Sequence, residues 1–95
     1  MSVHAVVLIQ CEIDEISEAA QAIADIGGVS EVYSVAGEFD LVAIVRVAAH
    51  DELATVIPGG IAKVEGVART ETLIAFQVHS KHDLERLFSI GFEDS

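Results

Sequence analysis

Three segments of this sequence are apolar at consecutive positions, and this feature limits the possible fold more than any other. They are Val6-Val7-Leu8-Ile9, Leu41-Val42-Ala43-Ile44-Val45 and Leu73-Ile74-Ala75-Phe76. Their β-branched residues predict strands. Successive side chains of a strand point to opposite faces, so a strand with one face in water alternates apolar and polar residues. These strands therefore belong to a sheet that is covered on both faces.

Helix and turn signals between these segments predict the order strand, helix, strand, strand, helix, strand, followed by a C-terminal helix. Gly27-Gly28 ends the first helix, and the glycine-containing turn at Gly37-Glu38 joins two strands as a hairpin. Pro58-Gly59-Gly60 interrupts the second helix, because a proline in a helix interior costs about 3 kcal/mol, so we expect a kink or two short pieces. The first predicted strand begins at Ala5 and ends near Cys11. The other predicted strands are 29–36, 41–47 and 67–78, and the predicted helices are 14–26, 50–64 and 80–91.

The two halves of the chain can be laid over each other with a shift of 38 positions. Ala5-Val6-Val7 then falls on Ala43-Ile44-Val45, and Gly28-Val29 falls on Gly66-Val67 without a gap. Two strand-helix-strand units of equal length pack as a split βαβ arrangement. The predicted fold is therefore an α+β, ferredoxin-like βαββαβ sandwich with a C-terminal helix, in one domain that spans residues 1–95.

In such a sandwich both main helices cover the same face of the sheet, and the second face stays apolar. Leaving several hundred Å² of it wet would forgo on the order of 10 kcal/mol of hydrophobic stabilisation. The sheet of another copy is the simplest cover. We therefore expect a symmetric dimer with stacked sheets, a dimeric α+β barrel.

Charge and composition narrow the classes of function. The 95 residues include 16 acidic side chains against 5 Lys and Arg, a formal charge of −11. Such a surface repels phosphate backbones, so we expect no direct contact with nucleic acid. The chain has no apolar run long enough for a membrane span and no signal-peptide pattern at its start, which predicts a cytoplasmic protein without membrane contact. The single Cys11 fits a reducing compartment.

Two motifs resemble a known family, and their order and spacing match over nearly the whole chain. Gly37-Glu38-Phe39-Asp40 fits a G-x-[YF]-D hairpin signature, and residues 61–72 resemble a segment in which a helix end is followed by Gly-Val and a T-x-T strand. Together they resemble the effector-binding (RAM) domain of the Lrp/AsnC transcriptional regulators. The chain departs from the family at Pro58-Gly59-Gly60, and it lacks the N-terminal helix-turn-helix of full-length regulators. The resemblance thus implies a stand-alone version without a DNA reader.

The resemblance also implies a ligand site. In the family, the hairpin loop and facing strand residues of neighbouring protomers line an amino-acid-sized pocket between dimers, which assemble into rings such as octamers. Carried onto this chain, the pattern nominates Gly37, Phe39, Asp40, Thr70 and Thr72. Asp40 suits an α-ammonium group, and the threonine hydroxyls and loop N–H groups suit a carboxylate. The alternative for each residue is structural: a turn glycine, a turn-bonding aspartate, a packed ring and ordinary strand threonines.

Other polar residues predict no further chemistry. His79 and His82 have no carboxylate or cysteine placed by the sequence to complete a metal site, so we expect no metal and no cofactor.

Three classes of function remain. The favoured one is a non-enzymatic effector-binding and oligomerisation module of transcriptional regulation, which binds a small amino acid or co-assembles with full-length Lrp/AsnC regulators. The second is a small dimeric α+β barrel enzyme of the monooxygenase or isomerase type, for which no cluster of His, Asp and Tyr or Trp can be placed in one cavity. The third is a purely structural interaction protein.

Overall fold

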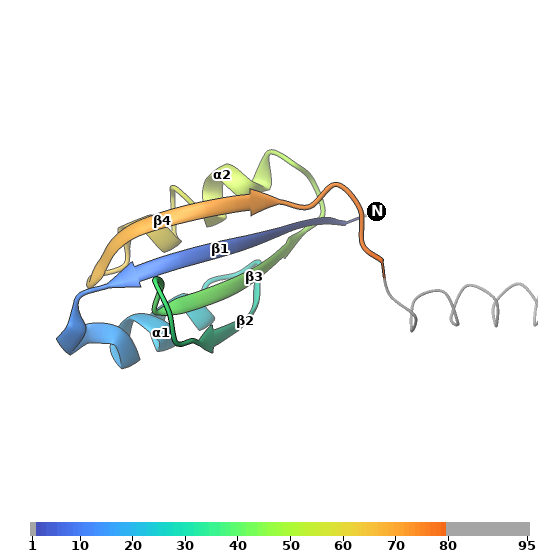
Figure 1. Cartoon of the computed structure of the whole chain (residues 1–95). Helices are drawn as coiled ribbons and strands as arrows, with labels where there is room; N and C mark the ends of the chain where they lie inside the picture. Colours follow the sequence, from blue (N-terminus) through green and yellow to red (C-terminus); the bar gives the residue numbers. More distant parts are fainter. Residues whose placement is uncertain (1, 80–95) are drawn as a thin grey trace, which may run out of the picture.

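The computed structural model describes residues 2–79 and shows one antiparallel sheet with helices on one face (Figure 1). The strands follow the order β2-β3-β1-β4, and every neighbouring pair is antiparallel. β1 and β2 thus run parallel with β3 between them, which confirms the ferredoxin-like prediction. The elements are β1 (Val3–Cys11), η1 (Ile13–Glu15), α1 (Ile16–Ala24), β2 (Val29–Ser34), β3 (Leu41–Val47), α2 (Glu52–Val56), η2 (Ile61–Lys63) and β4 (Val67–Ile74).

The hydrophobic core lies between the helices and one face of the sheet. Alternate residues of β1 and β3 are buried, as strand geometry requires for one covered face. The helical segments close this core with Ala19 and Ile23 of α1, Leu53 and Val56 of α2, and Ile61 of η2. The buried strand residues are Ala5, Val7, Ile9, Cys11, Leu41, Ala43, Val45 and Val47.

The opposite face of the sheet, which we name the open face, is also apolar at its centre. The residues between the buried ones point this way, and the central ones are Val6, Leu8, Val42 and Ile44, with Leu73 beside them on β4. Both helices pack on the other side, so no helix of the described part of the chain covers this face. Leu73 accordingly remains 54% exposed. The structure confirms the prediction of strands that are apolar on both sides.

The internal repeat is visible in the backbone. Gly28 and Gly66, which the shift of the sequence superposes, have nearly the same positive φ, 98° and 96°. Each one turns the chain from a helical segment into a strand, β2 or β4. Only glycine adopts such angles without strain, so the repeated glycine has a conformational reason.

The interrupted second helix is confirmed as two short pieces, α2 and η2. Proline cannot continue the helical hydrogen bonds. The two glycines after it lie against the end of α2, where an added Cβ at Gly59 would stand 2.7 Å from the Thr55 carbonyl oxygen and one at Gly60 would stand 2.6 Å from that of Val56. The chain therefore stays tightly wound beyond the end of α2, with the Gly59 N–H donating to the Ala54 carbonyl at 3.1 Å.

Several predicted boundaries were wrong. The fourth strand ends at Ile74 and not at residue 78, because its partner β1 begins at Val3 and no partner strand extends further within residues 2–79. The Ala75 N–H still donates to the His4 carbonyl at 2.9 Å. β2 ends at Ser34, β1 begins at Val3 and ends at Cys11 as predicted, and α1 starts after a 3₁₀ turn. The predicted C-terminal helix lies outside the described residues. In the described part, no helix combines the length and apolarity needed to cross a membrane.

Ile23→Ala should lower the free energy of unfolding by about 2 to 5 kcal/mol, because it opens a cavity at a fully buried position. The same substitution at Ile13, which is 87% exposed, is the matched control and should change it by less than about 0.5 kcal/mol. Urea unfolding followed by circular dichroism measures both. Equal losses at the two positions would show that the core is wrongly placed.

Candidate functional site

The loop that joins β2 to β3 contains the predicted Gly37-Glu38-Phe39-Asp40 signature. The Val35 N–H donates to the Asp40 carbonyl at 3.0 Å, which closes the loop. Gly37 has a φ of 145°, and an added Cβ there would meet no atom within 4 Å. The backbone conformation, and not lack of space, therefore requires glycine at this position.

Asp40 ties this loop to the end of the central strand β1. Its N–H donates to the Ile9 carbonyl at 2.9 Å, and its side-chain Oδ2 accepts a hydrogen bond from the Cys11 N–H at 2.8 Å. The carboxylate thus takes the place of a main-chain acceptor at the end of the β1–β3 ladder. The structural alternative, in which Asp40 bonds only its own turn, is wrong, because its side chain bonds the facing strand.

Two further contacts hold the loop against the sheet. The Gln10 side-chain amide donates to the Glu38 carbonyl at 3.0 Å, and the Arg69 guanidinium carbon lies 5.3 Å from the centre of the Phe39 ring. Gln10 and Arg69 are direct partners in the β1–β4 register. The loop, the end of β1 and the start of β4 therefore form one fixed cluster, which we name the hairpin cluster: Gln10, Glu38, Phe39, Asp40 and Arg69.

Thr70 and Thr72 lie on the other side of the sheet. They pair with Ile9 and Val7, whose side chains are buried in the core, so both threonines point to the helix-covered face at the edge strand. Arg69 points to the open face. One protomer therefore brings Phe39 and Asp40 together but does not place Thr70 and Thr72 beside them.

Sequence reasoning missed Gln10 and Arg69 as neighbours of the hairpin loop. Both lie in strand segments whose pairing register is needed to see that they meet. The available signal was the position of Arg69 directly before the Thr70-Glu71-Thr72 motif, which the predicted sheet places near the end of the first strand.

Cys11 has no features of a reactive thiol. Its side chain is buried, and burial together with the nearby Asp40 carboxylate raises the pKa of the thiol. The thiolate, which is the nucleophilic form, is therefore disfavoured. Cys11 fills space at the end of the core.

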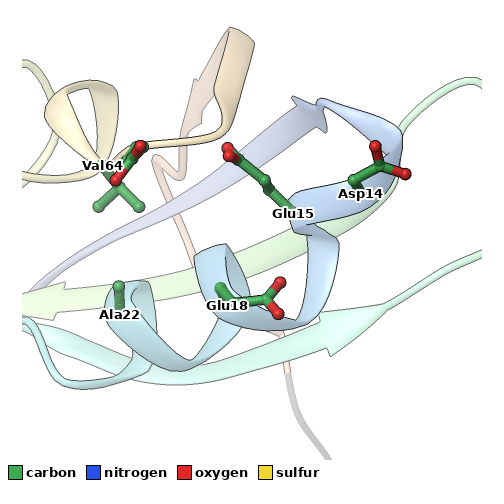
Figure 2. Close-up of a pocket in the computed structure, with 6 residues that line it drawn as sticks. Asp14, Glu15, Glu18, Ala22 and Val64 are labelled. Atoms are coloured by element: carbon green, nitrogen blue, oxygen red, sulfur yellow. The ribbon is translucent and has the colours of Figure 1, made fainter.

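Surface pockets occur elsewhere on the molecule. One of about 530 Å³ lies between α1 and the segment before β4, and it is lined by Asp14, Glu15, Glu18, Ala22, Val64 and Glu65 (Figure 2). Figure 2 shows the carboxylates of Asp14, Glu15 and Glu18 extending in different directions. None of these six lining residues is a cation, so they offer nothing to a ligand carboxylate. Within residues 2–79, no group of three or more His, Cys, Asp or Glu side chains is arranged to hold a metal ion.

Known proteins resemble this chain over most of its length. A family model described as "Lrp/AsnC ligand binding domain" matches residues 4–84. An uncharacterized HTH-type transcriptional regulator of Pyrococcus furiosus is 39% identical over 59 residues, which make up 62% of this chain and 39% of that protein. The chain thus matches well under half of the length of this relative.

Solved structures share the fold. A protein of Thermus thermophilus is 44% identical, with a TM-score of 0.79 over 83% of this chain and 99% of that one. A Neisseria meningitidis transcriptional regulator, solved as a complex with L-Met, has a TM-score of 0.72 over 83% of this chain and 54% of that one. The Neisseria protein is 12% identical, so it shows the common fold alone.

Asp40→Ala should lower the free energy of unfolding by about 1 to 3 kcal/mol, because the Cys11 N–H loses its acceptor. Glu38→Ala is the matched control, since Glu38 uses only its main-chain carbonyl in the cluster, and it should change stability by less than about 0.5 kcal/mol. Thermal and urea unfolding measure the difference. Equal stability of the two variants would contradict the tie between the loop and β1.

Proposed function

Because the chain belongs to the Lrp/AsnC family of ligand-binding domains, we propose that it binds a small amino acid and assembles into oligomers that act in transcriptional regulation. The matched family consists of transcriptional regulators and not of enzymes, so the expectation of a non-enzymatic chain is confirmed and the barrel-enzyme alternative is wrong. The proposed site of action is the cytoplasm, and the proposed domain does not itself contact nucleic acid. It reaches DNA by co-assembly with full-length regulators of the same family.

The observation that carries the assembly proposal is the composition of the open face. Its centre is apolar, and its border is polar, which is the anatomy of a protein–protein interface. His4 and Arg46 are partners at one end, and Gln10 and Arg69 are partners at the other. Glu31, Tyr33 and Glu71 lie along the two outer strands, each opposite an apolar residue of β3 or β1.

The charge of this border favours contact with an identical surface. Two arginines and two glutamates, Arg46, Arg69, Glu31 and Glu71, balance each other on the open face, whereas the whole chain has a formal charge of −11. A second copy that docks here meets an apolar centre and a neutral border. Docking by any strongly acidic part of the surface would bring like charges together.

The hairpin cluster supports the ligand proposal. Its loop is held in one conformation by contacts with β1 and β4, which reduces the ordering cost of binding. Asp40 uses one carboxylate oxygen for Cys11, and the other suits an α-ammonium group. Thr70 and Thr72 point to the opposite face, so they complete a site only when a neighbouring protomer supplies them. This need for a neighbour supports a ring of dimers, such as an octamer.

One observation favours the third class, a structural module without an effector. Asp40 already has a partner in the protein, and the loop is ordered by protein contacts alone. In that case, the signature Gly37 to Asp40 serves the joint between β1 and β3, and the open face still drives assembly.

The native protein should have a mass of at least twice the 10.1 kDa of one chain in light scattering after size exclusion. Ile44→Glu places a charge in the centre of the open face and should shift the mass to that of a monomer. Ile13→Glu makes the same change at a position that is 87% exposed on η1, and it should leave the oligomer intact. A native monomer at high concentration would refute the assembly.

At least one member of a panel of L-amino acids should raise the melting temperature of the native protein. A ligand at about a hundred times its Kd adds about 2.7 kcal/mol to the free energy of unfolding when it binds only the folded state. Asp40→Asn should lose this ligand-dependent rise, because the amide is a poorer partner for an ammonium group. Flat melting temperatures across the panel at millimolar concentration would favour the structural module.

A further inference from the structure

Arg69 is the cation that the fold places beside the hairpin loop. Lys63 lies on η2, and Arg46 lies with His4 at the other end of the open face. Within residues 2–79 the Lys and Arg side chains are those of Arg46, Lys63 and Arg69. Arg69, by contrast, pairs with Gln10, whose amide holds the loop carbonyl of Glu38.

The contact with Phe39 fixes Arg69 without using up its donors. The guanidinium carbon lies over the ring, 5.3 Å from its centre, and a cation–π contact of this kind is not a hydrogen bond. A guanidinium group has five N–H donors in a planar fork, and the contact with the ring does not engage them as hydrogen-bond donors to an oxygen. Arg69 is exposed in one protomer and lies at the border of the open face and not at its apolar centre, so its donors can reach a ligand at the edge of the proposed dimer.

The chemistry of the cluster is incomplete without this side chain. Asp40 suits the ammonium group of an amino acid, but loop N–H groups and threonine hydroxyls are neutral donors. A guanidinium group binds a carboxylate through two parallel, charge-assisted hydrogen bonds, which are about twice as strong as neutral ones. The Asp40 carboxylate accepts from the Cys11 N–H, and Arg69 pairs with the preceding residue Gln10, so an acidic and a basic side chain belong to residues at the same end of β1.

We propose that Arg69 binds the α-carboxylate of the effector while Asp40 holds its ammonium group. This inference rests on the proposed function and sharpens the ligand class to free, zwitterionic α-amino acids. Amino-acid amides and simple amines lack the carboxylate and bind weakly. Phe39 acts as the positioning residue, because its ring holds the guanidinium group in place.

The test compares each L-amino acid with its own primary amide, by thermal shift and by calorimetric titration of the full chain. The native protein should bind the best amino acid at least about tenfold more tightly than its amide. Arg69→Gln should weaken the amino acid about tenfold and leave the amide unchanged, so the discrimination disappears. Arg69→Lys keeps the charge but loses the planar fork of donors. Its preference for the acid over the amide should lie between those of the native protein and Arg69→Gln.

Lys63→Gln is the matched control, because it removes one positive charge from η2, away from the hairpin cluster. It should keep the full preference for the acid over the amide. Phe39→Leu should reduce the preference through Arg69 while the oligomer mass stays that of the native protein.

The outcomes separate the two proposals. If no amino acid binds the native protein, the proposed function fails, and this inference fails with it. If amino acids bind but the native protein takes the amide equally well, or Arg69→Gln keeps the native preference, the effector proposal stands and the role of Arg69 is refuted. The first of these comparisons uses the native protein, so it decides the matter even if Arg69→Gln does not fold.

Discussion

The pairing of β1 with strands on both sides is the constraint on which the rest of the molecule depends. β3 and β4 pair with it along nearly its whole length. One set of its alternate residues forms the floor of the core, and the other set forms the middle of the open face. Its end at Cys11 receives the Asp40 carboxylate, and its neighbour Gln10 holds the loop. Fold, assembly surface and candidate site therefore share one strand.

The duplicated architecture repeats the same turn in both halves of the chain. Gly28 and Gly66 have nearly the same positive φ, because each one turns the chain from a helical segment into a strand within a tightly packed region. A Cβ at Gly28 would lie 2.7 Å from Val56, and one at Gly66 would lie 2.5 Å from Glu15. Each turn thus packs on the helical segment of the other half. The second half departs from the first at Pro58-Gly59-Gly60, where one helix becomes two short pieces.

Local sequence patterns predicted most of the fold. They failed for features that depend on which residues of two strands pair with each other. Apolar runs, glycines and Pro58 correctly placed the strands, the turns and the broken helix. The end of β4 depends on where β1 begins, and the facing of Thr70 and Thr72 depends on the register with Ile9 and Val7. A shift of one residue exchanges the two faces of a strand, so sequence motifs alone could not separate these threonines from Asp40. Arg69 was missed for the same reason, since its neighbours come from two other segments.

The distribution of charge explains how so acidic a chain can associate with itself. Stacked sheets lie about 10 Å apart, and a helix layer adds about as much on each side. In the proposed dimer, the acidic residues of η1 and α1 on the two protomers are then separated by about 30 Å, several times the screening length of about 8 Å at physiological salt. Their mutual repulsion is small at that distance. The charges that do approach closely are those of the open-face border, where Arg46 and Arg69 balance Glu31 and Glu71. A net charge of −11 is therefore compatible with the proposed stacking of two open faces.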